Sequence, residues 1–145
     1  MTIGAFTPYD VYQLRAQRQE FDFLGGTIRA ALLTNAYVPD VAAHATWGDV
    51  SAHEVTDPDY VKQTLGGKTI ALDGSGRPVM DADDIDFGDP VTITAKYLVT
   101  YLDAASAYLM GHVDLNVGAG SLVVAAGPLV IAINAAGLYR IDPRA

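Results

Sequence analysis

The chain has 145 residues, a mass of 15.3 kDa and a formal net charge of -8 at pH 7, which suits one domain with a core of its own. Half of its residues are hydrophobic and 18% are charged, a composition that excludes an intrinsically disordered chain. The acidic excess argues against nucleic-acid binding, because phosphate contacts require clustered Lys and Arg. The absence of Cys excludes disulfides and thiolate metal sites.

The sequence shows no targeting or membrane segment. Its first residues lack the basic and apolar regions of a secretory signal. The longest apolar run, Leu122 to Ile133, contains Gly127–Pro128 and is shorter than the roughly 20 residues of a transmembrane helix. We therefore expect a soluble protein that is made in a cytoplasm and has no membrane partner.

Residues 1–26 are predicted to form an N-terminal arm and a short helix. Thr7 can serve as the N-cap, Pro8 takes the first helical position, and Asp10 follows three residues after the cap. The arm is rich in apolar side chains that must be covered: Ile3, Phe6, Tyr9, Val11, Tyr12 and Leu14. They can dock on the same domain or on a neighbouring chain, and Gly25–Gly26 favours the neighbour.

Residues 27–145 are predicted to form a single β domain, because short alternating runs are separated by Gly, Pro and Asp. The expected strands are 27–34, 68–72, 78–80, 85–87, 91–102, 107–115, 129–133 and 138–141. Asp73–Gly76 and Asn134–Gly137 are expected to be turns. Residues 103–106 are expected to link a hairpin. The pattern predicts a mainly β fold, an antiparallel β-sandwich or barrel of jelly-roll-like form.

The strand expected at Val91–Leu102 is the clearest of these. Its predicted apolar face is formed by Val91, Ile93, Ala95, Tyr97, Val99 and Tyr101. Leu98 and Leu102 interrupt the opposite, polar face, so we expect its second half to be covered. In the returning strand, Leu109, Val113 and Leu115 are expected on one side.

Residues 36–64 are predicted to form a long loop with little regular structure. Loops longer than about 15 residues are uncommon in compact domains unless they bind something. The aromatic residues of this loop and of the arm are therefore the predicted partner contacts: Phe6, Tyr9, Tyr12, Tyr37, Trp47 and Tyr60.

Two polar motifs resemble ligand sites but depart from the known patterns. Gly66–Gly67–Lys68–Thr69 lacks the earlier Gly of a phosphate-binding loop. His53–Glu54 begins like a zinc-protease motif, but Asp57 stands at the place of the second His and Pro58 follows it. We predict a turn at the first motif and a surface loop at the second.

Two further groups of polar residues could supply metal ligands, the first of them only if its loop folded back on itself. One is His44, Asp49 and His53; the other is the acidic run Asp81, Asp83, Asp84 and Asp86. Ile85 stands where a calcium loop needs an oxygen ligand. For His112, alone in its strand, we expect a contact or surface role. We predict no metal, no cofactor and no catalytic residues, and hence no enzyme.

Several segments form a recurring pattern over most of the chain: Ile28–Thr34, Tyr37–Asp40, His44, Asp49–Val50, Glu54–Val55, Leu65–Thr69, Asp81–Asp84, Ile93–Tyr97 and Asn134–Gly137. This pattern resembles a family of small virion structural proteins of tailed bacteriophages. Residues 103–120 depart from it, since the loop lengths differ there. The resemblance implies assembly into a particle and leaves open whether the protein lies in the head or the tail.

The first functional hypothesis is a capsid decoration (cement) protein, a homotrimer on the exterior of the virion capsid with the major capsid protein as its partner. A tail or head–tail connector component is the alternative. A carbohydrate-binding module that recognises a host surface is a further alternative, with Trp47, Tyr37 and Tyr60 as its aromatic platform.

Overall fold

The centre of the protein is a five-stranded antiparallel sheet with strand order β1-β9-β8-β2-β3. We describe residues 3–133 and 137–140 of a computed structural model. The strands are β1 (Thr7–Pro8), β2 (Ile28–Leu33), β3 (Gln63–Thr64), β8 (Tyr97–Leu102) and β9 (Leu109–Asp114). β2 pairs with β8 along its whole length, from Ile28 opposite Leu102 to Leu33 opposite Tyr97.

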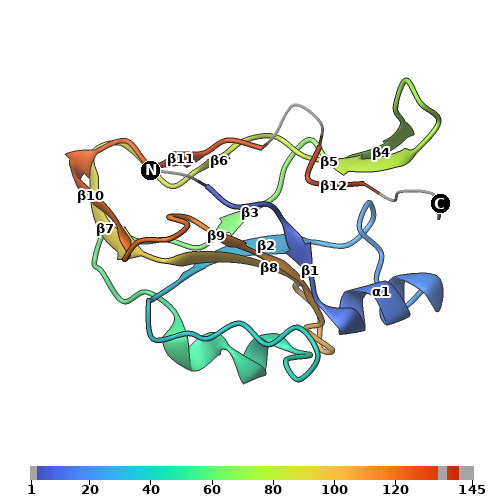
Figure 1. Ribbon diagram of the computed structural model, residues 1–145, viewed down its shortest axis with the longest axis horizontal. Helices are drawn as coiled ribbons and strands as arrows, with labels where there is room; N and C mark the ends of the chain where they lie inside the picture. The colour runs from blue at the N-terminus through green and yellow to red at the C-terminus, as the bar shows by residue number, and fades with distance from the viewer. Residues whose placement is uncertain (1–2, 134–136, 141–145) are drawn as a thin grey trace.

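Smaller antiparallel sheets form a second layer on one face of the central sheet (Figure 1). β7 (Val91–Ala95) pairs with β10 (Leu122–Gly127), and β6 (Ile85–Asp86) pairs with β11 (Val130–Ile131). β5 (Pro78–Asp81) lies between β4 (Thr69–Leu72) and β12 (Tyr139–Arg140). The predicted mainly β, antiparallel fold is confirmed. The sheets remain open, so the fold is sandwich-like.

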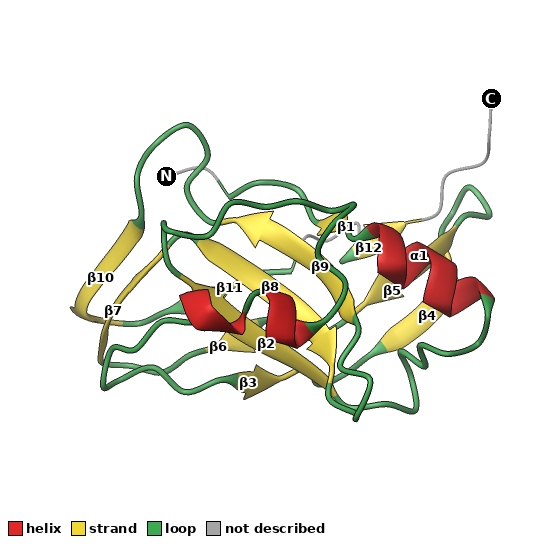
Figure 2. Cartoon of the chain, turned by 90° about the horizontal axis from the view of Figure 1, so that it is seen from below, coloured by secondary structure: helices red, strands yellow, loops and turns green. Residues whose placement is uncertain are grey.

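The first part of residues 36–64, which we call the excursion, covers the opposite face of the central sheet, and the end of the excursion forms β3 of that sheet. The excursion contains the 3-10 turns η1 (Trp47–Asp49) and η2 (Ser51–His53), which lie in front of β2 and β8 in Figure 2. All of β2 except Arg29 is therefore buried. The expectation that the second half of Val91–Leu102 is covered on both sides is confirmed, since Leu98 and Leu102 are buried along with Val99.

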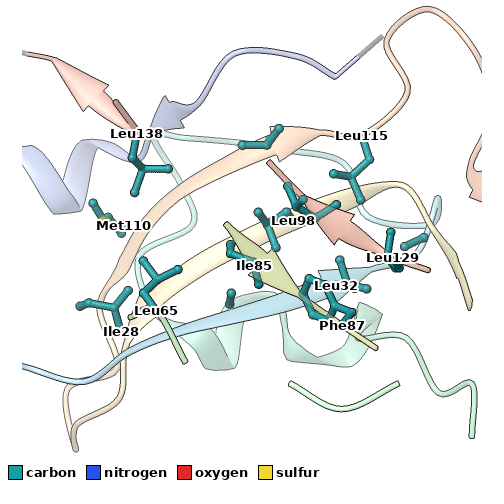
Figure 3. Close-up of a cluster of buried hydrophobic side chains, with 14 of the residues drawn as sticks. Ile28, Leu32, Leu65, Ile85, Phe87, Leu98, Met110, Leu115, Leu129 and Leu138 are labelled. Carbon is teal, nitrogen blue, oxygen red and sulfur yellow. The ribbon is translucent and has the colours of Figure 1, made fainter. Parts of the chain in front are cut away.

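The two faces of the central sheet have separate hydrophobic cores. The larger core lies between the two layers of the sandwich and includes Ile28, Leu32, Leu98 and Ile85 (Figure 3). The smaller core lies under the excursion, where side chains such as Leu33 and Val99 meet aromatic rings. Alternate residues of β2 and β8 thus enter different cores, as the two-residue period of a strand requires.

The prediction of one continuous strand at Val91–Leu102 is wrong. The chain bends at Lys96 between β7 and β8. The bend exchanges the faces: Ile93 and Leu98 point into the larger core, whereas Tyr97 points into the smaller one. The predicted apolar face therefore divides between two cores, because one extra residue in a strand inverts every side chain after it.

The returning strand β9 also departs from the expected pattern. The pairing of β8 with β9 shifts between Thr100 and Tyr101. Leu109 consequently joins the smaller core, while Val113 and Leu115 join the larger one. Placing these three side chains on one side was wrong, because the bulge was not visible in the alternation.

The helix of the arm begins later than predicted. Helix α1 spans Asp10–Gln17, and its N-cap is Tyr9, which makes no side-chain capping bond. Thr7 and Pro8 form β1 instead, opposite His112 and Gly111 of β9. The predicted cap at Thr7 was wrong, since pairing with a distant strand prevailed over the local signal for a helix start.

The remaining strand predictions agree with the structure apart from their ends. β3, which falls in the predicted loop 36–64, and β10 were not predicted, and the strand expected at 129–133 is reduced to β11. Met1 and Thr2 of the arm, Asn134–Ala136 of the expected turn and Ile141 of the last expected strand lie outside the described residues.

Candidate functional site

The arm docks on its own domain rather than on a neighbour, which corrects the prediction drawn from Gly25–Gly26. The N–H of Gly4 donates to the carbonyl of Asp114 over 2.7 Å, and the N–H of Tyr9 donates to Met110 over 3.0 Å. The Phe6 ring lies against Gly111, where no Cβ could fit beside it. The arm therefore acts as an edge strand of its own sheet.

Two of the predicted contact residues, Tyr9 and Tyr12, are core residues. Tyr12 is buried with its hydroxyl 2.7 Å from the sulfur of Met80, and its ring stands edge-on to Phe21. Tyr9 is fully buried under the excursion. Phe6 is half-buried. The arm thus offers a partner far less aromatic surface than the sequence suggested.

Tyr37 lies at the centre of a cluster that contains all three histidines of the chain. Its hydroxyl is 2.6 Å from the hydroxyl of Tyr9 and 3.1 Å from Nδ1 of His44. The rings of His44 and His53 lie 5.4 and 5.9 Å from the Tyr37 ring. Burial raises the pKa of Tyr9 and of Tyr37, so both phenols stay protonated. Tyr37 joins the excursion to the sheet.

His112 completes this aromatic cluster from β9. Its ring lies 5.5 Å from Tyr9 and 6.3 Å from Tyr97. Burial lowers its pKa despite the opposing charge of Asp114. Its Nδ1 has no hydrogen-bond partner among the described residues. The neutral form of this histidine is therefore favoured in the folded protein.

Trp47 and Tyr60 belong to a second group, which we call the Lys62 cluster: Trp47, Glu54, Tyr60, Lys62 and Tyr101. Trp47 stacks on Tyr101 with ring centres 4.6 Å apart, and the Lys62 ammonium lies 4.3 Å from the Trp47 ring centre. Lys62 donates to the Tyr101 hydroxyl over 2.8 Å and lies 3.5 Å from Glu54. The Tyr60 hydroxyl donates to Glu54 over 2.6 Å.

These contacts use the rings to fasten the excursion to β8 and β2. Trp47 already has an aromatic ring stacked on it, Tyr37 is buried, and the Tyr60 hydroxyl also accepts from the Leu32 N–H. A sugar platform needs an open ring face beside free polar groups. The three aromatic residues of the carbohydrate hypothesis do not make such a platform together.

The polar residues considered as metal ligands are directed at backbone amides or rings. Asp49 accepts from the N–H groups of Ala45 and Thr46 in a capping box, and these hydrogen bonds hold its pKa below the usual range. His44 and His53 both face Tyr37. Among the residues described, no group of three or more His, Asp or Glu side chains is arranged to hold a metal.

The acidic run has a similar structural use. The carboxylates of Asp81, Asp84 and Asp86 accept from the N–H groups of Ala82, Ile133 and Gly88, respectively, each over 2.8 Å. Asp81 and Asp86 therefore bind nearby backbone, and Asp84 binds the distant segment at Ile133. Gly66–Lys68 forms a turn before β4, with Gly67 at a φ of +60° and the Asp83 carboxylate close above it.

Lys96 is a structural residue that the sequence reasoning missed. It is only 6% exposed, and its ammonium donates to the carbonyls of Asn116 and Ala119 over 2.6 and 2.9 Å. It also lies 2.8 Å from the Asp114 carboxylate, and this hydrogen bond lowers the pKa of Asp114 against the effect of desolvation. A single lysine in a strand carries no local sign that three acceptors will meet it.

In comparisons with known proteins, no family model matches the chain, and no curated protein or solved structure is significantly similar to it. Within the described ranges, no helix is long and apolar enough to cross a membrane. The resemblance to phage virion proteins stays a prediction.

Proposed function

We propose that this chain is a structural component of a tailed-bacteriophage virion, a decoration protein that binds the outer surface of the major capsid shell and acts without catalysis. The resemblance in sequence is one support. Its segments include β2 (Ile28–Leu33), an interior strand of the central sheet, and Tyr37–Asp40 at the start of the excursion. A homotrimer on the capsid exterior remains part of this proposal.

The observation that carries the proposal is the distribution of exposed apolar side chains on an acidic surface. Val38 and Val61 are 74% and 63% exposed, although the chain carries a net charge of -8. Val38 and Val61 both belong to the excursion. A contiguous exposed apolar patch within a polar surface marks a protein–protein contact region, and a stable contact needs about 800 Å² per partner.

The polar clusters described above support binding rather than chemistry. Lys62, paired with Glu54, lies over the Trp47 ring. Lys96 donates to the backbone at the bend between β7 and β8, and Asp49 caps a 3-10 turn. These groups are engaged with the protein itself. A binding surface of apolar side chains on a rigid double-covered sheet is the role that this arrangement fits best.

The test is to locate and count the protein in purified virions. Antibody labelling should mark the heads, and quantitative mass spectrometry should give hundreds of copies per particle. Removal of the protein should lower the temperature at which the shells rupture. Labelling of tails alone, or a dozen or fewer copies, would replace the proposal by the tail or connector alternative.

A pair of matched variants tests the surface itself. Val38→Lys and Val61→Lys place charges on the excursion, and each should reduce binding of purified protein to shells stripped of it. Val123→Lys makes the same change at a comparably exposed side chain of β10 and should bind as the wild type does. Wild-type binding by both Val38→Lys and Val61→Lys would show that the excursion is not the contact surface, and equal loss in all three variants would show that the effect is not specific to it.

A further inference from the structure

The edges of the strands are protected in different ways across the described part of the chain. The free edge of β7 is covered by side chains: Asp57 accepts from the Thr94 N–H and Asp59 from the Thr92 N–H, each over 2.8 Å. β10 has an irregular register against β7. β1, β3, β6, β11 and β12 are two residues long. Such devices prevent strands from pairing with other chains.

β4 has none of these protections. It is an outer strand of the sheet β12-β5-β4, and its register against β5 is regular. Its residues Thr69–Leu72 carry no charge and no proline, and all four are exposed. Ile70 is 46% and Leu72 70% exposed. In Figure 1 the β4–β5 hairpin lies at one end of the molecule, away from the central sheet.

The backbone of β4 directs its free hydrogen-bonding groups outward at these two residues. The N–H of Asp73 donates to the Arg77 carbonyl inside the hairpin, over 2.9 Å. Because N–H and C=O groups alternate in direction along a strand, those of Ala71 also face β5, and those of Ile70 and Leu72 face the open edge. Met80 is the residue of β5 opposite Ile70, and its carbonyl accepts from the Leu138 N–H, on the side of β5 away from β4. Ile70 and Met80 are therefore not hydrogen-bonded to each other, which agrees with this assignment.

We propose that β4 pairs antiparallel with β4 of a second copy of this chain across a two-fold axis through Ala71. In this register Ile70 lies opposite Leu72 of the second copy, and their outward N–H and C=O groups face each other as hydrogen-bonded pairs. Both apolar side chains then share one face of the new sheet. The hydrogen-bonding direction and the apolar pattern thus select the same register.

The charges of the hairpin fit a second copy. Its residues Lys68 to Asp81 contain two basic and two acidic side chains, Lys68, Arg77, Asp73 and Asp81, and are neutral in sum, whereas the whole chain carries -8. Two acidic chains can therefore approach each other here with little repulsion. The two-fold register also places Asp73 opposite Thr69 and not opposite a like charge.

This inference does not rest on the proposed function. A two-fold contact closes at two copies, so it predicts a species of twice the 15.3 kDa of one chain. The homotrimer expected for a decoration protein requires a different contact. The mass in solution therefore reports on β4 whatever the role of the protein in a particle.

Cross-linking tests the register directly. Ala71→Cys introduces a single thiol, since the chain has no Cys, at the position that lies opposite itself. Side chains of such a non-hydrogen-bonded pair approach most closely. Mild oxidation should convert this variant to a covalent dimer much faster than Val38→Cys, whose thiol is exposed in the excursion. Equal rates would overturn the proposal.

Sedimentation equilibrium tests the edge without a cross-link. Ile70→Lys leaves the backbone unchanged and should weaken dimerisation about tenfold, since charged side chains block strand edges. Ile70→Pro should do the same by removing an outward N–H. Melting curves of both variants check that the monomer remains folded. A wild-type chain that stays monomeric at millimolar concentration, or a dimer unaffected by Ile70→Lys, would overturn the proposal.

Discussion

Replacing Lys96 by Met tests whether one buried lysine holds the corner between β7 and β8. The change keeps most of the apolar stem and removes the ammonium. Two charge-assisted hydrogen bonds, to Asn116 and Ala119, and the ion pair with Asp114 are lost. The result reports on the residue at which the strand changes from one core to the other.

The expected cost follows from these three contacts. Each charge-assisted hydrogen bond to a carbonyl contributes about 1.5–3 kcal/mol. The Asp114 side chain is 29% exposed, so water can solvate the carboxylate and the ion pair adds only about 1 kcal/mol. We expect Lys96→Met to lower the free energy of unfolding by about 4–7 kcal/mol, a large part of the 5–15 kcal/mol that is typical of domains.

Urea denaturation followed by circular dichroism measures this loss. Arg18→Met is the matched control, because the Arg18 pair with Glu20 is at the surface, with a side chain 57% exposed; it should cost below about 0.5 kcal/mol. If Lys96→Met costs as little as the control, the lysine does not hold the corner.

The pH dependence of the free energy of unfolding at acid pH provides a second test of Lys96→Met. The pKa of Asp114 is lowered from its ordinary 3.8 in the folded protein. The stabilisation that the ionised Asp114 carboxylate gives the folded protein is therefore fully present above pH 3.8. It is lost as the pH falls through the lowered pKa of the folded state. In Lys96→Met, the loss of stability between neutral and acid pH should be smaller than in the wild type. An equal loss in both proteins would show that Lys96 does not lower the pKa of Asp114.

Three further predictions follow from the docked arm and from the two aromatic groups. Deletion of residues 1–14 should unfold the protein, because each buried aromatic ring that is lost costs about 3–5 kcal/mol and Tyr9 and Tyr12 are both buried. Tyr60→Phe should lower the free energy of unfolding by about 1–3 kcal/mol, because Glu54 and the Leu32 N–H lose their partner. Because the pKa of His112 is lowered in the folded protein, the unfolded chain binds the proton more readily, and the wild type loses stability as the pH falls below the ordinary histidine pKa of 6.5. His112→Gln should lose less stability over the same pH range.

Each of these predictions has an outcome that contradicts it. A deletion variant that is folded by circular dichroism but no longer assembles would support docking of the arm on a neighbouring chain. For Tyr60→Phe, an unchanged urea midpoint would remove the hydroxyl from the support of the excursion, with Tyr139→Phe as the control. For His112→Gln, a pH profile parallel to that of the wild type between pH 7 and pH 5 would place the titration elsewhere.

Local chemistry made part of this fold readable from the sequence. The two-residue alternation of Ile28–Leu33 predicts β2, and Asp73–Gly76 predicts the β4–β5 turn. In that turn the Asp73 carboxylate accepts from the Ser75 N–H over 2.8 Å, and Gly76 takes a φ of +76°. Interactions over two or three residues are contained in the sequence itself, so such turns can be inferred without the rest of the molecule.

The partners of the candidate contact residues could not be inferred in this way. Tyr12 reaches Met80, 68 positions along the chain, and Lys62 reaches Tyr101, 39 positions along. The sequence indicated correctly that aromatic residues gather in the arm and the excursion. Whether a ring faces a partner or its own sheet depends on which distant segments meet, and no local pattern records that.

The sequence by itself determined the β-rich class, the antiparallel arrangement and the long excursion. The tertiary structure alone decided which face of each strand enters which core. An alternating pattern states that neighbouring residues point to opposite sides, but in β8 both sides are buried, so the pattern cannot tell one core from the other. One bend at Lys96, which has acceptors up to 23 positions away, sets that choice for β8, because it inverts the side chains of β8 relative to those of β7.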